Sequence, residues 1–300
     1  MQQDLRKYAG FRRSKSQNVM IVMTFVILIL FYGVFMFFPI GYAAVGSFFN
    51  WRPSRMQFDF IGFDNYIWLF TNKTTLTALG NTLYFTVVVV IFRTLTGLIF
   101  AALINEITRG KALYRTLFFL PVITSTVAVA LVWNWLYEPA TGPLNYYLGL
   151  LGVPRLSWLK DKMLALPSVM LMTVWKDMGY ALVVYMAGMT GIPHSLYESA
   201  SIDGCTRFKS FFHITLPMLK PTTTFVLTTS IISYCQTFTQ IDLMTEGGPG
   251  KATYTLVYML YQEAFKSNRF GRSSAISFLL FAIILVMSLL QLKTSNKEVS

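Results

Sequence analysis

A basic and an acidic residue, Lys176 and Asp177, interrupt an otherwise apolar stretch at about 167–190. On a helix, Asp177 shares a face with Thr173, four residues earlier, and with Tyr180, three residues later. Neighbouring residues lie about 100° apart on a helix, so we expect Lys176 to point in another direction. A carboxylate, a hydroxyl and a phenol on one face predict a surface that hydrogen-bonds a polar ligand.

A second polar face follows, with Ser230, Tyr234 and Thr237 at positions i, i+4 and i+7. Together with the Asp177 face it suits a sugar, whose hydroxyls need hydrogen bonds and whose C–H faces stack on aromatic rings. The alternative for Ser and Thr is helix–helix packing, where these residues are common. We expect Arg93, in another apolar stretch, to contact a neighbouring helix or subunit rather than a ligand.

The remaining reactive residues form no catalytic or metal-binding pattern. Cys205 and Cys235 are isolated from each other, and neither His194 nor His213 stands at metal-ligand spacing from them. Gly250-Lys251 resembles the end of a P-loop, but the first glycine and the final Ser/Thr of that motif are missing. We therefore expect no catalytic residue, no metal and no bound cofactor in this chain.

The composition places these polar faces inside a membrane protein. Of 300 residues, 54% are hydrophobic and only 13% are charged, about half the fraction of soluble proteins. The net charge of +12 could indicate a nucleic-acid partner, but no zinc-finger spacing or basic run is present. A lipid bilayer is the better explanation, because basic residues flank membrane spans next to anionic headgroups.

Apolar stretches predict six membrane-spanning helices, each near the roughly 20 residues that a bilayer requires. They lie at about 19–38, 81–104, 117–137, 167–190, 222–241 and 273–292. The sequence thus predicts an all-α polytopic membrane protein. It consists of a segment 1–18, a six-helix domain 19–292 with a long loop at 191–221, and a tail 293–300.

The positive-inside rule orients these helices. An even number of spans puts both termini on one side, and the segments on that side hold 13 Lys and Arg residues against 10 on the other. Both termini are therefore predicted to be cytoplasmic, as is the loop 191–221.

The loop 191–221 carries the signals of a short, capped helix. Ser195 and Glu198 have the spacing of a capping box at a helix start, and Gly204 suits the left-handed position after a helix end. A rigid helix held between two membrane spans is a docking element for a cytoplasmic partner. The alternative is that the loop merely connects two spans.

The same loop resembles the EAA motif of binding-protein-dependent ABC transporter permeases. The resemblance rests on Glu198-Ser199-Ala200, Asp203-Gly204, Ile214, Leu216-Pro217 and Pro221. Two small residues depart from the motif, since Ser199 and Cys205 each replace an alanine.

Other segments extend the resemblance to about residues 60–292. Asn81-Thr82-Leu83 is similar to the start of the permease core, and the stretch 115–121 to the start of its third helix. The stretch 243–249, with Gly247-Gly248-Pro249, and the stretch 261–265 resemble the maltose-type, carbohydrate-uptake branch.

This resemblance implies a type I ABC importer permease fold in the bacterial cytoplasmic membrane. In the family, two related permease subunits form the pathway as a heterodimer, and each EAA helix inserts into one of two cytoplasmic ATPases, which bind ATP and Mg. An extracytoplasmic sugar-binding protein delivers the cargo. The residues expected at the ATPase joint are Glu198, Ser199, Ala200, Asp203, Gly204, Leu216 and Pro217. Those expected along the substrate pathway are Thr173, Asp177, Tyr180, Ser230, Tyr234 and Thr237.

Three other functions stay open at this point. The same machinery could carry a polyol or a sugar phosphate. An ion-gradient-driven carrier would need no docking helix. A membrane-embedded enzyme would need a catalytic group that the sequence lacks.

Overall fold

The computed structural model describes residues 15–107 and 109–297. Of the predicted terminal segments 1–18 and 293–300, residues 1–14 and 298–300 lie outside the described residues, and the rest belong to helices. The described chain is helical except for one short hairpin and its connecting loops.

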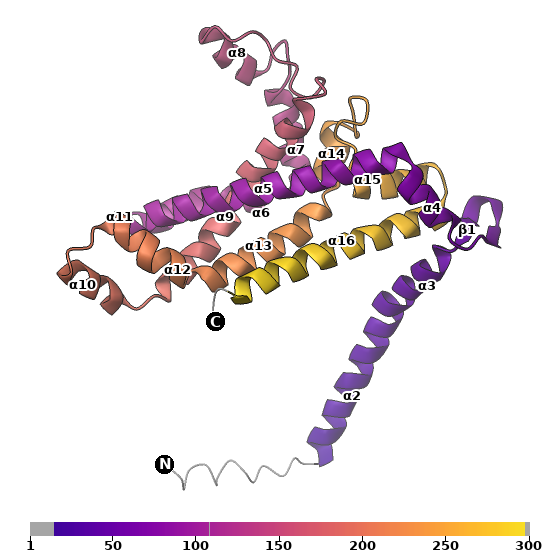
Figure 1. Cartoon of the computed structure of the whole chain (residues 1–300), viewed down its shortest axis with the longest axis horizontal. Coiled ribbons are helices and arrows are strands. Elements are labelled where there is room, and N and C mark those ends of the chain that lie inside the picture. The colour runs from indigo at the N-terminus through magenta and orange to yellow at the C-terminus, as the bar shows by residue number, and fades with distance from the viewer. Residues whose placement is uncertain (1–14, 108, 298–300) are drawn as a thin grey trace.

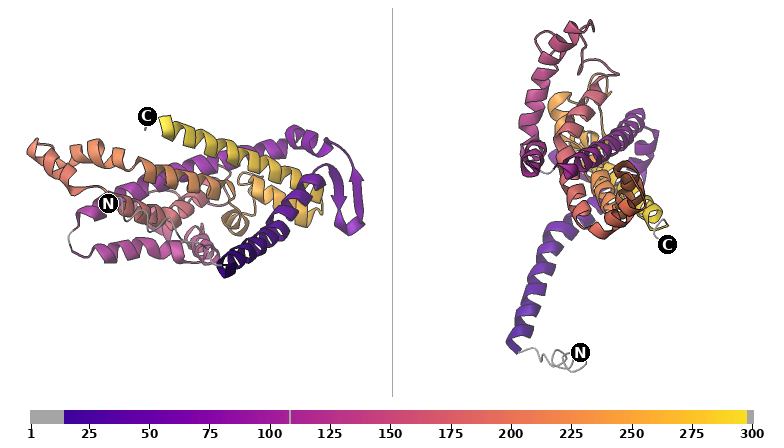
Figure 2. Two further views of the ribbon diagram at one scale, coloured as in Figure 1. Left: turned by 90° about the horizontal axis from the view of Figure 1, so that it is seen from below. Right: turned by 90° about the vertical axis from the view of Figure 1, so that its left-hand side faces the viewer.

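Four helices run side by side and form the body of the molecule (Figures 1 and 2). They are α5 (Lys73–Glu106), α9 (Ala165–Thr190), α13 (Lys220–Cys235) and α16 (Phe270–Lys297). Helix α5 packs against α9 and α13, and α13 packs against α16. The predicted second, fourth and sixth spans correspond to α5, α9 and α16, which are each longer than expected.

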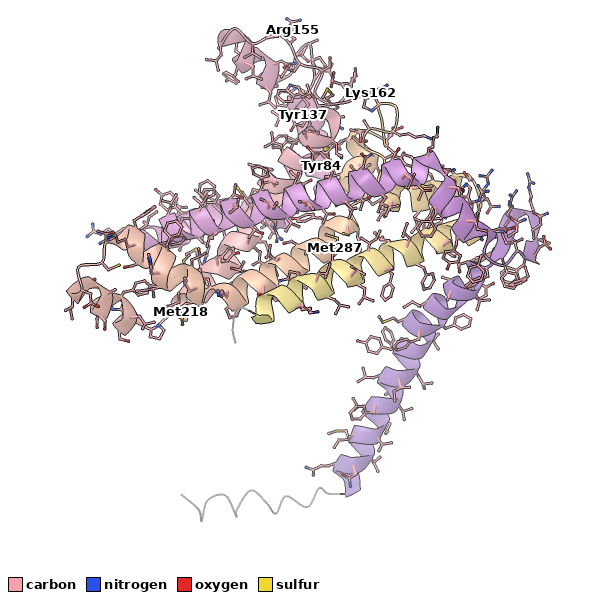
Figure 3. The ribbon with its side chains drawn as sticks, viewed as in Figure 1. Tyr84, Tyr137, Arg155, Lys162, Met218 and Met287 are labelled. Atoms are coloured by element: carbon pink, nitrogen blue, oxygen red, sulfur yellow. The ribbon has the colours of Figure 1, made fainter. Side chains whose placement is uncertain are left out.

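The first predicted span leaves this body as an arm. It comprises α2 (Lys15–Tyr32), the π-helical turn η1 (Gly33–Phe37) and α3 (Phe38–Gly46). The side chains of α2 project into open space (Figure 3), and none of the arm's most apolar 18-residue window is buried, whereas α3 contacts α16 and β1. A helix that is apolar all round needs lipid or a partner around it.

A β-hairpin follows the arm at one end of the body. Strand β1 (Phe49–Arg52) pairs antiparallel with β2 (Gln57–Phe60), so that Phe49 faces Phe60 and Trp51 faces Phe58. The prediction of an all-α chain is wrong for this segment. Aromatic residues at every second position favour a strand, and their rings contact each other across the pair.

The connections contain short helices. They are η2 (Pro53–Arg55), α4 (Asp64–Thr71), α8 (Pro143–Leu150), α10 (His194–Ile202), α11 (Arg207–Ser210), η3 (Phe211–Thr215), α12 (Leu216–Met218), α14 (Thr239–Met244), α15 (Leu256–Tyr261) and η4 (Gln262–Lys266).

The predicted third span is bent rather than continuous. Helices α6 (Lys111–Ile123) and α7 (Thr126–Leu136) meet at an angle of 94°. Thr124 and Ser125 are extended at the break, three residues after Pro121, which has no N–H for the helical ladder. The break frees the carbonyl of Val122, to which Lys176 Nζ donates at 3.4 Å.

The predicted fifth span is also shorter than expected. Helix α13 ends at Cys235, and the chain turns before α14 begins at Thr239. Its 16 residues span roughly 24 Å, less than the ~30 Å of a bilayer core. The segment is rich in Ser, Thr and β-branched residues, which are weak helix formers.

Among the described residues, four helices are long and apolar enough to cross a membrane alone, or five if the bent pair counts as one span. The predicted number of six thus depends on whether α13 also crosses.

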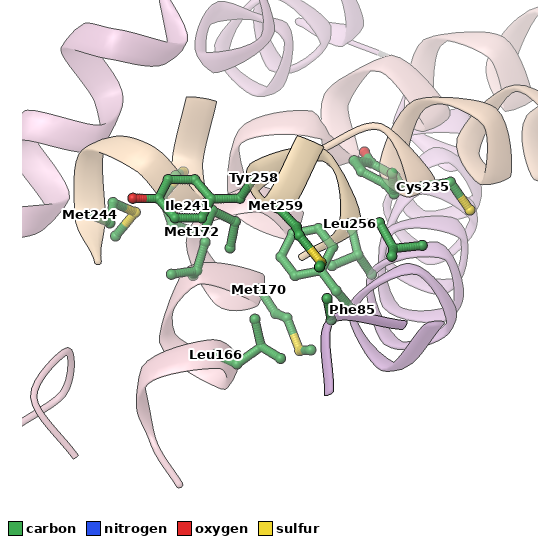
Figure 4. Close-up of a cluster of buried hydrophobic side chains, with 14 of the residues drawn as sticks. Phe85, Leu166, Met170, Met172, Cys235, Ile241, Met244, Leu256, Tyr258 and Met259 are labelled. Carbon is green, nitrogen blue, oxygen red and sulfur yellow. The ribbon is translucent and has the colours of Figure 1, made fainter. Parts of the chain in front are cut away.

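The core lies where α5, α9 and α13 to α15 meet (Figure 4). Phe85 of α5 belongs to one buried cluster with Met170 and Met172 of α9 and Leu256 and Met259 of α15, all nearly inaccessible to solvent. Methionine side chains fill irregular gaps, as helices that meet at different angles require. This core holds the polar faces of α9 and α13 in place.

Gly179 sets the contact between α9 and α6. A Cβ at this position would collide with the backbone carbonyl of Phe118. We expect Gly179→Ala to separate the two helices, at a cost of about 1–3 kcal/mol, and to lower the thermal midpoint of the purified protein. Gly80→Ala, on α5 with nothing within 4 Å, is the matched control and should be neutral or slightly stabilising. Equal midpoints for both variants would contradict the prediction.

Candidate functional site

The short helix predicted in the loop 191–221 is observed as α10. It lies beyond the end of the four-helix body, opposite the hairpin (Figure 1), and contains no buried residue. Only a short turn separates it from α9, and α11, η3 and α12 lead from it to α13. An exposed helix at the end of the body is a surface for contact with another protein.

The predicted start of this helix is wrong. The N-cap is Pro193, without a side-chain cap, so Ser195 lies inside the helix and forms no capping box. The Glu198 carboxylate instead lies 3.0 Å from Nδ1 of His194, one helical turn earlier. A capping box requires its Ser directly before the first helical residue, and the helix begins at His194, two residues too early for Ser195 to take that position.

The predicted end of the helix is confirmed. Gly204 has φ +75°, the left-handed conformation that favours glycine. The N–H of Cys205 donates to the carbonyl of Ala200 at 2.8 Å, and that of Gly204 to Ser201 at 3.1 Å. These two bonds form a Schellman motif, which satisfies carbonyls at the helix end. Ser199 accepts from the N–H of Asp203 at 3.1 Å, so four of the predicted residues belong to this turn.

Side-chain contacts join the loop to the body. Arg207 pairs with Glu106 at the end of α5 at 2.8 Å. Within the loop, the Tyr197 hydroxyl of α10 bonds Thr215 of η3 at 2.8 Å. Leu216 is half-buried and Pro217 exposed in α12, just before the fully buried Leu219. A cavity of about 360 Å³ lies between α10, α11 and the end of α5. These side-chain contacts connect α11 to the end of α5 and α10 to η3, which precedes α12 and α13.

The mid-span polar residues form one cluster. The Tyr234 hydroxyl donates to Asp177 Oδ2 at 3.0 Å, and Arg93 Nε donates to the backbone carbonyl of Asp177 at 3.1 Å. Arg93 also donates to the hydroxyl of Ser230. Its guanidinium lies 5.1 Å from the ring centre of Tyr180 and 5.6 Å from that of Tyr234. The cluster therefore joins α5, α9 and α13, as the interhelical role expected for Arg93 requires.

The expected divergence of Lys176 and Asp177 is wrong. Lys176 Nζ lies 3.5 Å from Asp177 Oδ1, although the two Cα positions face different directions. The long alkyl stem of lysine reaches back to the carboxylate. Lys176 is only 7% exposed, so it needs a counter-charge within reach.

A cavity of about 330 Å³ opens at this cluster. Of the predicted pathway residues, Asp177, Tyr180 and Tyr234 line it, and Ser230 bonds Arg93 behind it. Arg93, Thr229 and Ser233 line it as well. Arg93 was predicted only as a helix contact, although a lone charge within an apolar stretch is a signal for a cavity.

Two predicted pathway residues do not reach this cavity. Thr173 is fully buried and donates to the carbonyl of Val169, one turn earlier in α9. Thr237 is buried in the turn between α13 and α14. Both instead belong to the packed interior.

At the other end of the body, Asn81 and Thr82 hold the loop that contains Gly247-Gly248-Pro249. Asn81 Nδ2 donates to the carbonyls of Lys251 and Tyr254 at 3.0 and 3.1 Å, and Thr82 accepts from the N–H of Leu256 at 2.9 Å. Burial, followed by the nearby Glu263 and Tyr258, raises the pKa of Tyr254 to about 12, so its phenol is neutral at ordinary pH. Lys251 donates to the hydroxyl of Thr74 at 2.6 Å, a structural contact.

Removing the Thr82 hydroxyl should loosen this loop. Thr82→Val leaves the buried N–H of Leu256 without an acceptor, which costs about 1–3 kcal/mol. We expect faster amide hydrogen exchange over residues 251–258, measured by mass spectrometry on the purified protein. Thr77→Val is the control, because Thr77 is exposed and bonds only its own helix. Unchanged exchange in Thr82→Val would refute the role of this bond.

Comparison with known proteins matches these features to one family. Residues 93–294 match the family described as "Binding-protein-dependent transport system inner membrane component". The match includes the cluster, α10 and most of α16. The chain belongs to this family. The resemblance inferred from the EAA motif is thus confirmed.

Curated relatives cover nearly the whole chain. A probable ABC transporter permease protein of Bacillus subtilis, YurN, is 33% identical over 93% of this chain and 97% of its own length. The sn-glycerol-3-phosphate transport system permease protein UgpA of Pectobacterium atrosepticum is 32% identical, with 97% of both chains covered. A multiple sugar-binding transport system permease protein of Streptococcus mutans, MsmF, is 31% identical over 88% of this chain and 91% of its own.

The fold also matches a solved importer. A chain of a bacterial ABC transporter involved in the import of the acidic polysaccharide alginate superposes with a TM-score of 0.83 at 24% identity, covering 94% of this chain and 96% of that one. This family member therefore has the fold of an ABC importer permease.

Proposed function

We propose that this chain is one permease subunit of an ATP-driven importer in the bacterial cytoplasmic membrane, and that it carries a sugar or an oligosaccharide. The observation that carries the proposal is α10, an exposed helix with a Schellman end at the end of the body. The family membership and the relatives named for sugar and glycerol-phosphate transport support it.

The ATPase partners dock on α10 in this proposal. Glu198, Ser199, Ala200, Asp203 and Gly204 form the joint, with Leu216 and Pro217 at the return to the membrane. The two cytoplasmic ATPases bind ATP and Mg, and this chain binds neither. When the ATPases close, α10 moves with them. The ion pair of Arg207 in α11 with Glu106 then carries the movement to α5, and the bond of Tyr197 to Thr215 of η3 carries it towards α13.

The pathway is completed by a second, homologous permease subunit. The cavity at Asp177, Tyr180 and Tyr234 lies on the surface of a single chain, so a second chain has to close it. The extracytoplasmic solute-binding protein delivers cargo on the side opposite α10. An alginate importer has been solved with its periplasmic protein, which supports such a partner.

The proposed topology has six spans, with α13 and α14 forming the fifth, and with both termini in the cytoplasm. Helix α16 runs from the hairpin end of the body towards the α10 end (Figure 1), which supports a C-terminus on the α10 side. Lipid covers the outer helices, and no nucleic-acid partner is needed to explain the basic charge.

The test is to purify the membrane complex, identify its subunits and bound saccharide, and reconstitute it in vesicles. We expect uptake to require ATP and the solute-binding protein, and to survive collapse of the proton gradient. Uptake that stops when the gradient collapses while ATP persists would instead identify an ion-coupled carrier.

A further inference from the structure

Arg93 is a buried cation without a carboxylate partner. It lies in the middle of α5 and is 6% exposed. Its polar partners are neutral, namely the backbone carbonyl of Asp177 and the hydroxyl of Ser230. Among the described residues, no carboxylate oxygen lies within 4.0 Å of its guanidinium.

The one carboxylate nearby is already engaged. Asp177 Oδ1 lies 3.5 Å from Lys176 Nζ, and Oδ2 accepts from Tyr234. The other charged residues of α5, α9 and α13 are Lys73, Glu106 and Lys220, which lie at helix ends. The mid-span cluster of Arg93, Lys176 and Asp177 therefore has a net charge of +1.

An unmatched charge at this depth is costly. A charged side chain at the centre of a membrane helix costs about 2.5–3.5 kcal/mol on insertion scales, and such residues face a cavity or a partner. Arg93 faces the 330 Å³ cavity, a volume within the ~300–1,000 Å³ of small-molecule sites. The aromatic faces of Tyr180 and Tyr234 stabilise the guanidinium but do not neutralise it.

We propose that Arg93 binds an anionic group of the cargo, so that the transported saccharide carries a carboxylate or a phosphate. This proposal rests on the importer function above and narrows its substrate class. The guanidinium has planar donors that match both anions, and the cavity also offers Thr229 and Ser233 for sugar hydroxyls. Asp177 then positions the neighbouring Lys176 and Tyr234 rather than repelling the cargo directly.

The test measures uptake by vesicles that contain the reconstituted complex and its solute-binding protein. Three labelled probes are compared: a sugar phosphate, a uronic acid disaccharide and an uncharged disaccharide. We expect uptake of one anionic probe, and the two anionic arms identify whether the group is a phosphate or a carboxylate. Arg93→Gln should lower that uptake at least 10-fold, and Arg93→Lys, which keeps the charge, should lower it less. Arg115→Gln, exposed on α6, is the charge-matched control.

A second measurement uses the unmodified protein. The anionic probe, but not the uncharged disaccharide, should raise the thermal midpoint of the purified wild-type complex. Uptake of the uncharged disaccharide alone, equal uptake by Arg93→Gln and Arg115→Gln, or a midpoint that the anionic probe leaves unchanged would each overturn the proposal. A wild-type complex that takes up none of the probes with ATP would contradict the importer function itself.

Discussion

Replacing Gly204 with valine should uncouple the ATPases from this chain, with transport and binding-protein-stimulated ATP hydrolysis lowered at least about 10-fold. Gly204 has φ +75° in the Schellman turn that ends α10. An L-residue in this conformation costs roughly 1–2 kcal/mol, and a β-branched residue more. Because α10 is exposed and held by few contacts, the turn unwinds more easily than it tolerates this strain.

The space around Gly204 makes backbone strain the main effect of this substitution within the chain. A Cβ at Gly204 meets no atom within 4 Å. Gly152, with φ +79° and equally open space, lies in the connection after α8. Gly152→Val carries the same strain and should retain co-purifying ATPases, whereas Gly204→Val should lose them. Equal retention in both variants would show that the α10 turn plays no part in docking.

The two ends of α10 illustrate what local sequence predicts well. Gly204 was predicted at its observed position, because few other residues tolerate a left-handed helix end. The capping box at Ser195 and Glu198 was not observed, because Pro193 is the N-cap and the helix therefore begins before Ser195. A start signal is reliable only when no competing signal lies beside it.

The membrane spans show a similar limit. Composition alone locates the arm, α5, α9 and α16, because long apolar runs have few other stable structures in a membrane. The 94° bend between α6 and α7 depends on a tertiary contact, since Lys176 of α9 binds the carbonyl that the break frees. No periodicity in residues 117–137 encodes that partner. The hairpin was missed because its aromatic alternation lies in a segment assigned to a loop.

The polar cluster was predicted in part. The i, i+4 spacing places Ser230 and Tyr234 on one face of α13, and the structure brings both to Asp177 and Arg93. Arg93 meets this face because of the way α5 and α9 are rotated relative to each other. The spacing of residues within one helix does not predict how two helices are rotated. The prediction that Thr237 continues this face is wrong for a different reason, because α13 ends two residues before Thr237.

Substituting Asp177 should have the second large effect. Asp177→Ala leaves Lys176 buried without its counter-charge and Tyr234 without its acceptor. Loss of one partner of a fully buried ion pair lowers the free energy of unfolding by about 3–5 kcal/mol. We expect a loss of about 1–3 kcal/mol here, because the Asp177 side chain is 24% exposed to solvent. Transport should fall at least 10-fold, measured as uptake per assembled complex in vesicles.

A double variant separates the structural role of Asp177 from its role in the pathway. Lys176→Met with Asp177→Asn removes both charges and keeps an acceptor for the Tyr234 hydroxyl, so the unpaired lysine no longer destabilises the fold. If Asp177 contributes to the pathway, the double variant regains the wild-type thermal midpoint but not wild-type uptake. Recovery of both would assign Asp177 to helix packing alone. Recovery of neither would mean that Lys176 is itself required, since its donation to Val122 at the bend would then be the contact that matters.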